Sequence, residues 1–295
     1  MKNKYKILYP LLGLVMLFSA CTPDTYELGS LKTKDELKYT VTPDSKNPNM
    51  IILESLTPNA TPIWNTPIGR SIRVKDTIVV AFPGTYSIKY SVQSAGGIVE
   101  AEPFNLVVTT FDAEYIKDPL WSLLTGGIDK EKTWYLDLNA NGKSKFFTGP
   151  LFFYGTNDSW ESVTDGVKVG GDSWNWSPDY PGNTWLMEAA DFGSMTFDLK
   201  GGVHVKVNHK TISKLGIQNG SFMLFPKNHT LKMTDAGILH NVGKDGHVKD
   251  WGNLKVLSLT ADHMQLGALR DAALSGEGAC LLVYNFVSKE YYDSH

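Results

Sequence analysis

Short runs that alternate between apolar and polar residues, each ended by a turn signal, limit most strongly what this 295-residue chain can form. Residues 85–92 alternate almost without a break after a Pro-Gly pair. Residues 195–199 and 203–207 alternate on either side of a Lys-Gly-Gly turn. A period of two sends every second side chain to the same face, as in a half-buried strand. We therefore expect an all-β protein.

The strand-like runs fall into two groups, and the length of the chain also predicts two domains. Residues 36–110 hold the first group and are expected to form an Ig-like β-sandwich, because turn signals recur about every ten residues. Residues 111–120 are expected to be a linker. Residues 121–295 hold the second group, for which we expect a jelly-roll-type β-sandwich, with a lipocalin-like barrel as the alternative.

Composition excludes some functions and raises others. The formal net charge is −3 and no block of Lys or Arg stands out, so no nucleic-acid partner is expected. Aromatic residues make up 12% of the chain and include eight Trp and thirteen Tyr. Large flat side chains in that number either fill a β core or stack on a flat ligand.

The N-terminus has the pattern of an export signal. Three lysines precede an apolar run over residues 7–18, which ends in Ser19-Ala20-Cys21. That run is too short to span a bilayer as a stable helix, so residues 1–20 are expected to be a signal peptide. The small residues before Cys21 resemble a bacterial lipoprotein lipobox. The resemblance implies a lipid on Cys21, a tether over residues 21–35 and no other membrane anchor. An ordinary signal peptide with a chance cysteine is the alternative.

The second cysteine is expected to be structural. Cys280 lies within the apolar run 279–284, which is typical of a buried strand. A buried thiol behaves as a small hydrophobic side chain, and no nearby His marks it as a nucleophile.

Part of the first domain resembles a PKD domain. The residues that carry the resemblance are Pro58-Asn59-Ala60-Thr61-Pro62-Ile63-Trp64, then Gly84-Thr85-Tyr86-Ser87-Ile88-Lys89-Tyr90-Ser91-Val92, then the turn Ala95-Gly96-Gly97. The usual Trp-Asp-Phe-Gly-Asp-Gly stretch is replaced here by Trp64-Asn65-Thr66-Pro67-Ile68-Gly69. The resemblance covers about residues 36–110 and implies a spacer module in a surface protein, without chemistry of its own.

A loop region rich in tryptophan is the candidate ligand site. Residues 154–160 and 170–185 mix Trp and Tyr with Gly, Pro, Asp and Asn, which favour loops over strands. Sugar rings pack their C–H faces on aromatic rings, and their hydroxyls need carboxylate and amide partners. The candidate binding residues are Tyr154, Trp160, Asp172, Trp174, Asn175, Trp176, Asp179 and Tyr180. The alternative is that these rings pin the loop onto the domain, and Trp160 and Trp185 fit both interpretations equally.

The second domain also resembles a known group of proteins. Leu123–Gly127, Lys132–Asp137, the tryptophan-rich loop, Met195–Leu199 and the strand-like run 281–289 resemble the C-terminal domain of surface glycan-binding lipoproteins of Bacteroidetes, of the SusE/SusF-position type. The resemblance implies non-catalytic capture of a polysaccharide or oligosaccharide at the outer face of the outer membrane. It also implies SusC/SusD-like outer-membrane partners and no cofactor.

Two other function classes stay open. A glycoside hydrolase needs two carboxylates placed across the scissile bond, and Glu161, Glu188, Asp191 and Asp198 are available in the second domain. Asp191 and Asp198 would face opposite sides of one regular strand, which argues against that pair. A structural or adhesive surface protein is the other alternative.

Metal sites are not expected. Asp137-Leu138-Asn139-Ala140-Asn141-Gly142 mimics the start of a calcium loop, but position twelve would be Thr148 rather than Glu. Asn-Gly between two strand-like runs is more simply a hairpin turn. A metal could use His204 with His209, but His204, Lys206 and Asn208 form the polar face of an alternating strand, which is expected to be solvated. The histidines at 229, 240, 247 and 263 show no recognised ligand spacing.

Overall fold

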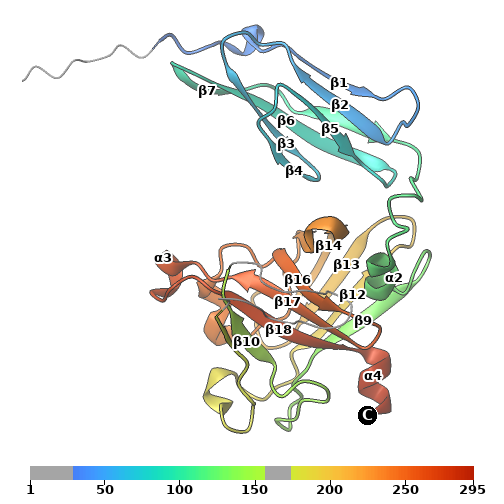
Figure 1. Ribbon diagram of the computed structural model, residues 1–295, viewed down its shortest axis with the longest axis vertical. Helices are drawn as coiled ribbons and strands as arrows, with labels where there is room; N and C mark the ends of the chain where they lie inside the picture. The colour runs from blue at the N-terminus through green and yellow to red at the C-terminus, as the bar shows by residue number, and fades with distance from the viewer. Residues whose placement is uncertain (1–28, 157–173) are drawn as a thin grey trace, which may run out of the picture. The chain divides into compact units, whose positions relative to one another are not determined.

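The computed structural model describes residues 29–156 and 174–295, and it confirms the all-β class (Figure 1). Cys21, Trp160, Glu161 and Asp172 therefore lie outside the described residues. The described chain forms two compact units. One gathers most of the strands before residue 107, and the other holds residues 107–295 together with 43–51 and 79–86. Within the described ranges, no helix is both long and apolar enough to cross a membrane.

The N-terminal strands form two small antiparallel sheets. The first sheet has the order β1-β2-β5, with β1 (Tyr39–Pro43), β2 (Met50–Ser55) and β5 (Lys75–Val79). The second has the order β4-β3-β6-β7, and β8 also pairs with β6. Its strands are β3 (Thr61–Thr66), β4 (Gly69–Ser71), β6 (Gly84–Ser94), β7 (Gly97–Glu100) and β8 (Phe104–Val108). The turn before β7 needs Gly97, whose φ of 124° lies in the left-handed region.

Aromatic rings fill the core of this N-terminal region. Trp64 and Tyr90 are fully buried, and their ring centroids lie 4.5 Å apart. Tyr39 packs against both rings, and the indole Nε1 of Trp64 donates to the carbonyl of Arg73 at 3.1 Å. The tryptophan of the PKD-like stretch is therefore a core residue.

The C-terminal strands form a closed antiparallel barrel of eight strands. Their order around the barrel is β9-β12-β13-β14-β15-β16-β17-β18, and β18 pairs back with β9. The strands are β9 (Glu131–Leu136), β12 (Gly193–Asp198), β13 (His204–His209), β14 (Ile217–Phe225), β15 (Thr230–Thr234), β16 (Asn253–Leu259), β17 (His263–Leu269) and β18 (Leu281–Ser288). Two further strands, β10 (Leu151–Tyr154) and β11 (Asn175–Trp176), extend the sheet beyond β18.

The predicted jelly-roll sandwich is therefore wrong, and the barrel alternative has the correct architecture. From β12 to β18 each strand pairs with the next one along the chain, which makes a meander rather than two sheets. The same alternation of apolar and polar residues serves a sandwich and a barrel. The pairing of β9 with β18, which closes the barrel, joins residues that are far apart in the sequence and leaves no local signal.

Side chains of alternate residues fill the barrel. Trp134 of β9, Phe197 of β12, and Tyr284 and Phe286 of β18 are all fully buried. An eight-stranded barrel is just wide enough for side chains to fill it. Cys280 is buried directly before β18, as predicted, and burial raises the pKa of its thiol, which disfavours the reactive thiolate.

Three short helices complete this part of the chain. They are α2 (Pro119–Thr125), α3 (Ala272–Ser275) and α4 (Lys289–Ser294). Short 3-10 turns lie at η1 (Lys34–Glu36), η2 (Thr184–Leu186), η3 (Pro226–Asn228) and η4 (Val242–His247). Asp118 caps α2, because its carboxylate accepts from the backbone N–H of Leu120.

Asp137 anchors the loop that follows β9. Its side chain is fully buried, and its carboxylate accepts from the backbone N–H groups of Lys145, Phe146 and Phe147 at 2.6–3.0 Å. Burial raises the pKa of this carboxyl group, while the three N–H groups act in the opposite direction. Both carboxylate oxygens of Asp137 thus accept hydrogen bonds from the backbone and do not act as calcium ligands. The loop is no hairpin either, because β9 and β10 both pair with β18.

We expect Asp137→Ala to lower the free energy of unfolding by at least about 2 kcal/mol, because a buried donor left without its acceptor costs roughly 1–3 kcal/mol. Urea unfolding followed by far-ultraviolet circular dichroism measures the loss. The control is Asp262→Ala, which removes an exposed carboxylate and should leave stability nearly unchanged. Equal midpoints for both variants and the wild type would contradict this role.

Candidate functional site

Three aromatic rings stack at the edge of the sheet, where β11 pairs with β10. The antiparallel register sets Phe153 opposite Trp176, and their rings stack with centroids 5.2 Å apart and planes at 23°. Trp185 in η2 stacks with Trp176 at 6.2 Å and 27°. We call Phe153, Trp176 and Trp185 the aromatic stack.

The stack ends in an unusually exposed tryptophan. Phe153 is buried, Trp176 is 39% exposed and Trp185 is 72% exposed. A tryptophan side chain can bury on the order of 150–250 Å² of surface, worth several kcal/mol at about 25 cal/mol per Å². Because Trp185 is mostly exposed, it gains little of this stabilisation from burial. Its ring keeps a large apolar face that another molecule could cover.

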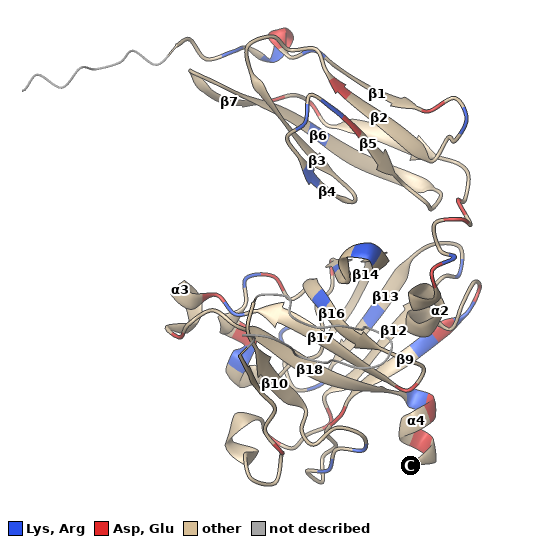
Figure 2. Ribbon diagram, viewed as in Figure 1, with Lys and Arg blue, Asp and Glu red and all other residues tan. Residues whose placement is uncertain are grey.

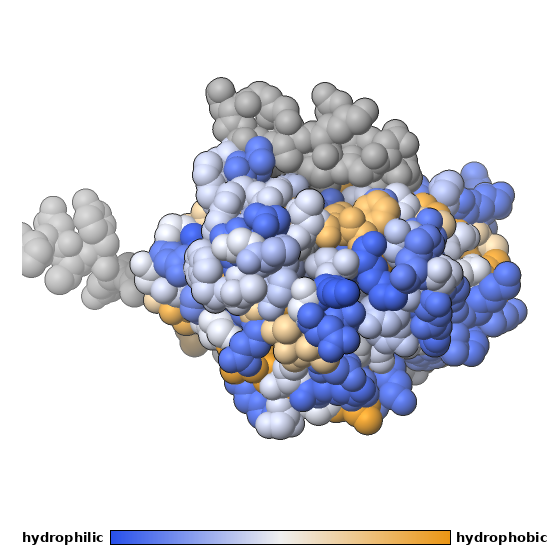
Figure 3. Space-filling view, turned by 90° about the horizontal axis from the view of Figure 1, so that it is seen from below, coloured by the Kyte–Doolittle hydropathy of each residue, from blue (hydrophilic) through white to orange (hydrophobic). Residues whose placement is uncertain are grey.

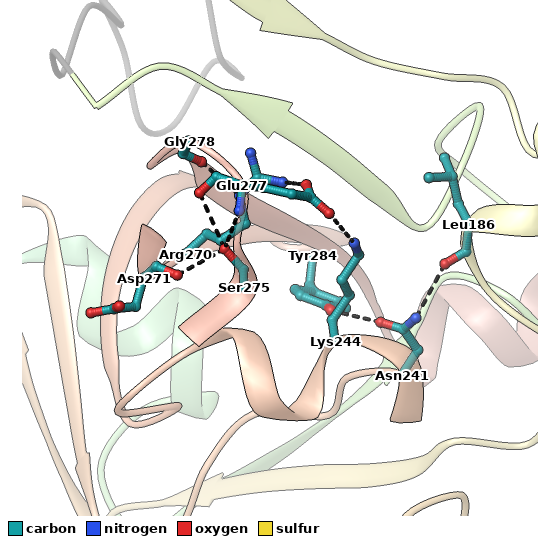
Figure 4. A network of polar contacts seen from close by, with 9 residues as sticks. All are labelled: Leu186, Asn241, Lys244, Arg270, Asp271, Ser275, Glu277, Gly278 and Tyr284. Carbon is teal, nitrogen blue, oxygen red and sulfur yellow. Dashed lines mark hydrogen bonds and ion pairs between the residues drawn. The ribbon is translucent and has the colours of Figure 1, made fainter. Parts of the chain in front are cut away.

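Hydrogen bonds fix the backbone at Leu186, the residue after Trp185 (Figure 4). The side-chain N–H of Asn241 donates to the carbonyl of Leu186 at 3.1 Å, and the oxygen of the same amide accepts from the Tyr284 hydroxyl at 2.8 Å. Tyr284 is fully buried, and burial raises the pKa of its hydroxyl well above the ordinary value. The hydroxyl therefore stays a donor, which fixes the orientation of the Asn241 amide and leaves its N–H groups for Leu186.

Ion pairs and hydrogen bonds also fix the segments next to Asn241. Lys244 of η4 pairs with Glu277, which also pairs with Arg270 (Figure 4). The Arg270 Nε donates to the carbonyl of Gly278 at 2.8 Å. Asn241, which holds the backbone next to Trp185, is thus followed in the chain by a segment that other elements at this end of the barrel keep in place.

Two of the predicted binding residues are packing residues instead. Tyr154 is 7% exposed and belongs to a buried cluster with Phe152, Leu257, Leu281 and Val283. Tyr180 is also 7% exposed, and its hydroxyl donates to the carbonyl of Met187 at 3.1 Å. Neither ring has an open face for stacking in the structure, so we do not place them in the candidate site. The loop composition that suggested exposure does not show which rings return to the core.

The remaining predicted residues lie at the surface close to the stack in sequence. Trp174 is 53% exposed, and its carbonyl accepts from the N–H of Gly155. Asn175 is exposed opposite Tyr154 in the β10–β11 register. The Asp179 carboxylate accepts from the N–H of Gly182 at 3.0 Å, so it stabilises a turn. Of the rings in the described ranges, none stacks on Trp174.

A hollow of about 420 Å³ lies beside Trp185. Met187, Phe192 and Val242 supply apolar walls, while Glu188 and Thr211 supply polar groups. The size falls within the range typical of small-molecule sites. We call this hollow, together with the aromatic stack, the tryptophan site.

Surface charge around the barrel is mixed. Lys, Arg, Asp and Glu are interspersed over the described chain without a basic stripe (Figure 2). The face seen from below is mainly hydrophilic, with small separate hydrophobic patches (Figure 3). Many of the charges pair locally, as do Lys210 with Asp191 and Lys214 with Asp245. A polyanion would find little net attraction on this surface.

The histidines suggested as a metal pair lie on opposite faces of β13. His204 is exposed and approaches Asp198 at 3.2 Å, whereas His209 is 4% exposed and bonds to Gln218 at 3.0 Å. Within residues 29–156 and 174–295, no group of three or more His, Cys, Asp or Glu side chains could hold a metal ion.

Sequence reasoning missed two residues of this site. The sequence does not decide whether Trp185 binds ligand or packs against the domain, because it borders a strand-like run. In the structure Trp185 is more exposed than Trp174 and Trp176. Asn241 carried no sequence signal, because its role depends on Tyr284, a residue 43 positions further along the chain.

No protein-family model matches the sequence, and no curated protein matches it significantly. The function must therefore be argued from the residues themselves.

Stability should fall as the pH drops through about 6.5, and His209 contributes to this. Burial lowers the pKa of His209 below its ordinary value of 6.5, and nearby His240 adds to the effect. The unfolded chain then takes up the proton first, so the contribution of His209 is full above pH 6.5 and is lost on acidification.

Thermal melting between about pH 7.5 and about pH 5 measures this dependence. The melting temperature of the wild type should fall over that range, and His209→Gln should fall less, since glutamine can still donate to Gln218 without titrating. Parallel curves for the two proteins would show that His209 takes no part.

Proposed function

We propose that this protein is a cell-surface lipoprotein that binds a polysaccharide or oligosaccharide without cleaving it, for uptake by a SusC/SusD-like outer-membrane system. In this proposal Cys21 carries the lipid and residues 21–35 are the tether. The two N-terminal sheets serve as a PKD-like, Ig-like spacer. The protein faces the cell exterior and uses no cofactor.

The observation that carries the proposal is the exposed aromatic stack. Trp185, the outer ring of the stack, is 72% exposed and presents an apolar face to solvent, although the next residue in the chain, Leu186, is anchored. Rings held in this way lose little conformational freedom when a ligand binds, which favours affinity. The C–H faces of sugar rings match such a platform. Glu188 and Thr211, which line the hollow beside Trp185, and exposed Asn175 next to Trp176 offer partners for hydroxyls. Trp174 is included as a further stacking residue.

The arrangement of carboxylates favours binding over hydrolysis. Asp191 accepts from Lys210 at 2.5 Å, and this hydrogen bond lowers the pKa of the carboxyl group. A glycosidase acid must instead carry a raised pKa so that it is protonated at the start of the reaction. Asp198, the last residue of β12, lies opposite His204 of β13 on the outer face of the barrel, outside both hollows. Of the candidate carboxylates that the structure describes, a lipid-anchored hydrolase would have Glu188 beside Trp185.

We expect Trp185→Ala to weaken glycan binding about ten- to a hundred-fold, because it removes one stacking face. The magnitude is taken by analogy from nucleic-acid bases that stack on aromatic side chains. Its melting temperature should change little, because the ring is 72% exposed. Native gels cast with laminarin, xylan, galactomannan, pullulan or pectin identify a retarding polysaccharide. Calorimetric titration with that polysaccharide then measures the affinity.

The matched control is Phe146→Ala, which removes another exposed aromatic ring outside the tryptophan site. It should bind as tightly as the wild type. Reducing-end assays on the same polysaccharide should detect no product. Release of reducing ends would favour the hydrolase, and a lack of retardation in every gel would favour an adhesive role.

The anchor is tested separately. In the native host, wild-type protein should fractionate with membranes, and Cys21→Ala should be released or remain unprocessed, because no thiol is left to accept the lipid. Immunoblots of membrane and soluble fractions report the result. Membrane fractionation of Cys21→Ala that equals the wild type would contradict the anchor.

A further inference from the structure

A second hollow adjoins the tryptophan site. It measures about 460 Å³, and its walls include Ala190 and Phe192, which also line the hollow beside Trp185. The two hollows therefore lie on either side of Ala190 and Phe192, in the segment that leads from η2 into β12. We call the second hollow the tyrosine groove, because Tyr135 and Tyr292 form part of its lining.

The floor of the tyrosine groove is the outer face of three neighbouring barrel strands. Ser194 of β12 lies directly opposite Asn208 of β13. Trp134 of β9 pairs with Met195 and faces the barrel interior, so the next residues, Tyr135 and Ser194, face outward. A phenol ring, a hydroxyl and an amide thus form a row across the wall.

The tyrosine rings are held in place. Tyr292 of α4 meets Tyr135 edge to face with centroids 5.1 Å apart. Lys145 lies over the Tyr292 ring at 4.5 Å and donates to the Tyr292 carbonyl at 2.9 Å. Both rings are half-buried, so each keeps part of its surface open to the groove. Rings fixed by a neighbouring ring and a cation are preorganised for stacking.

The groove offers polar groups, and its charged groups are paired. Its hydroxyl and amide side chains come from Ser194, Asn208, Asn139 and Asn141. Its two carboxylates each pair with a lysine, Asp191 with Lys210 and Asp293 with Lys289. Neutral donors and acceptors around aromatic rings suit an uncharged sugar better than a phosphate or a nucleotide, which would need an excess of positive charge.

We propose that the tryptophan site and the tyrosine groove form one elongated site, occupied by a single uncharged glycan chain that crosses the segment at Ala190 and Phe192. This inference rests on the proposed function and adds the class of ligand to it. Sugars at one end stack on Trp185 and Trp176, and sugars further along the chain contact Tyr292, Tyr135 and Asn208. A short oligosaccharide reaches only the first part, so affinity rises with chain length.

The experiment is a chain-length series. Partial acid hydrolysis of the retarding polysaccharide gives oligosaccharides from disaccharide to octasaccharide, and each is titrated calorimetrically into the full-length protein. The variants are Trp185→Ala, Tyr292→Ala and Asn208→Ala. The control is Tyr291→Ala, which removes the same kind of ring from the same helix but outside the groove.

The proposal predicts that Trp185→Ala weakens binding at every length. Tyr292→Ala should weaken the longest chains about tenfold, within the range for a stacked ring, and leave the shortest binding chains unchanged. Asn208→Ala, on the barrel wall, should show the same dependence on length and covers the case in which Tyr292→Ala disturbs α4. Tyr291→Ala should match the wild type throughout.

Two results overturn the proposal, and they differ from each other. If Trp185→Ala loses affinity while Tyr292→Ala and Asn208→Ala bind the longest chains like the wild type, the groove is not part of the site and the proposed function stands. If the wild type binds no polysaccharide or oligosaccharide of the series, the proposed function fails and the elongated site fails with it.

Discussion

The way in which β18 divides its pairing determines the arrangement of the whole C-terminal unit. Phe286–Ser288 pair with β9 and close the barrel, whereas Leu281–Tyr284 pair with β10, which leaves the barrel wall. The free edge of β10 then takes up β11, and this pairing places Trp176 against Phe153. Side chains fill the barrel interior, so the site that we propose lies outside it. The hollow beside Trp185 lies between η2, the segment that follows it and the start of η4, and the tyrosine groove lies on the outer wall.

Exposed aromatic rings at this edge forgo the stabilisation that their burial would give. Trp185 would gain several kcal/mol from burial, yet hydrogen bonds from Asn241 to Leu186 and from Tyr284 to Asn241 hold its segment in place with the ring exposed. Elsewhere the same residue type is used differently. Trp64 and Trp134 are fully buried, and their indole N–H groups donate to backbone carbonyls. Trp121 is also fully buried, but its indole N–H has no hydrogen-bond partner among the described residues, so the clearest difference between the core tryptophans and Trp185 is burial.

Local patterns in the sequence predicted the strands but not their closure. The alternation on both sides of the Lys-Gly-Gly turn correctly predicted the β12–β13 hairpin, and the apolar run around Cys280 correctly predicted the buried strand β18. Whether those strands form a sandwich or a barrel depends on the distant pairing of β9 with β18, which alternation does not encode. In the loop, composition does not show which rings are buried and which are exposed. Tyr154 and Tyr180 return to the core, whereas Trp185, next to a strand-like run, stays exposed. Lipidation of Cys21 and the roles of Trp160 and Asp172 stay predictions, since these residues lie outside the described ranges.

The most direct test of the central claim is fluorine NMR of the protein labelled with 5-fluorotryptophan, with each resonance assigned by single Trp→Phe variants and followed during titration with the retarding polysaccharide. If the anchored stack is the ligand platform, the resonances of Trp185 and Trp176 shift and saturate at the calorimetric affinity, while those of the buried Trp64, Trp121 and Trp134 stay where they are. Saturable binding that leaves the Trp185 and Trp176 resonances unmoved would place the glycan elsewhere and contradict the account.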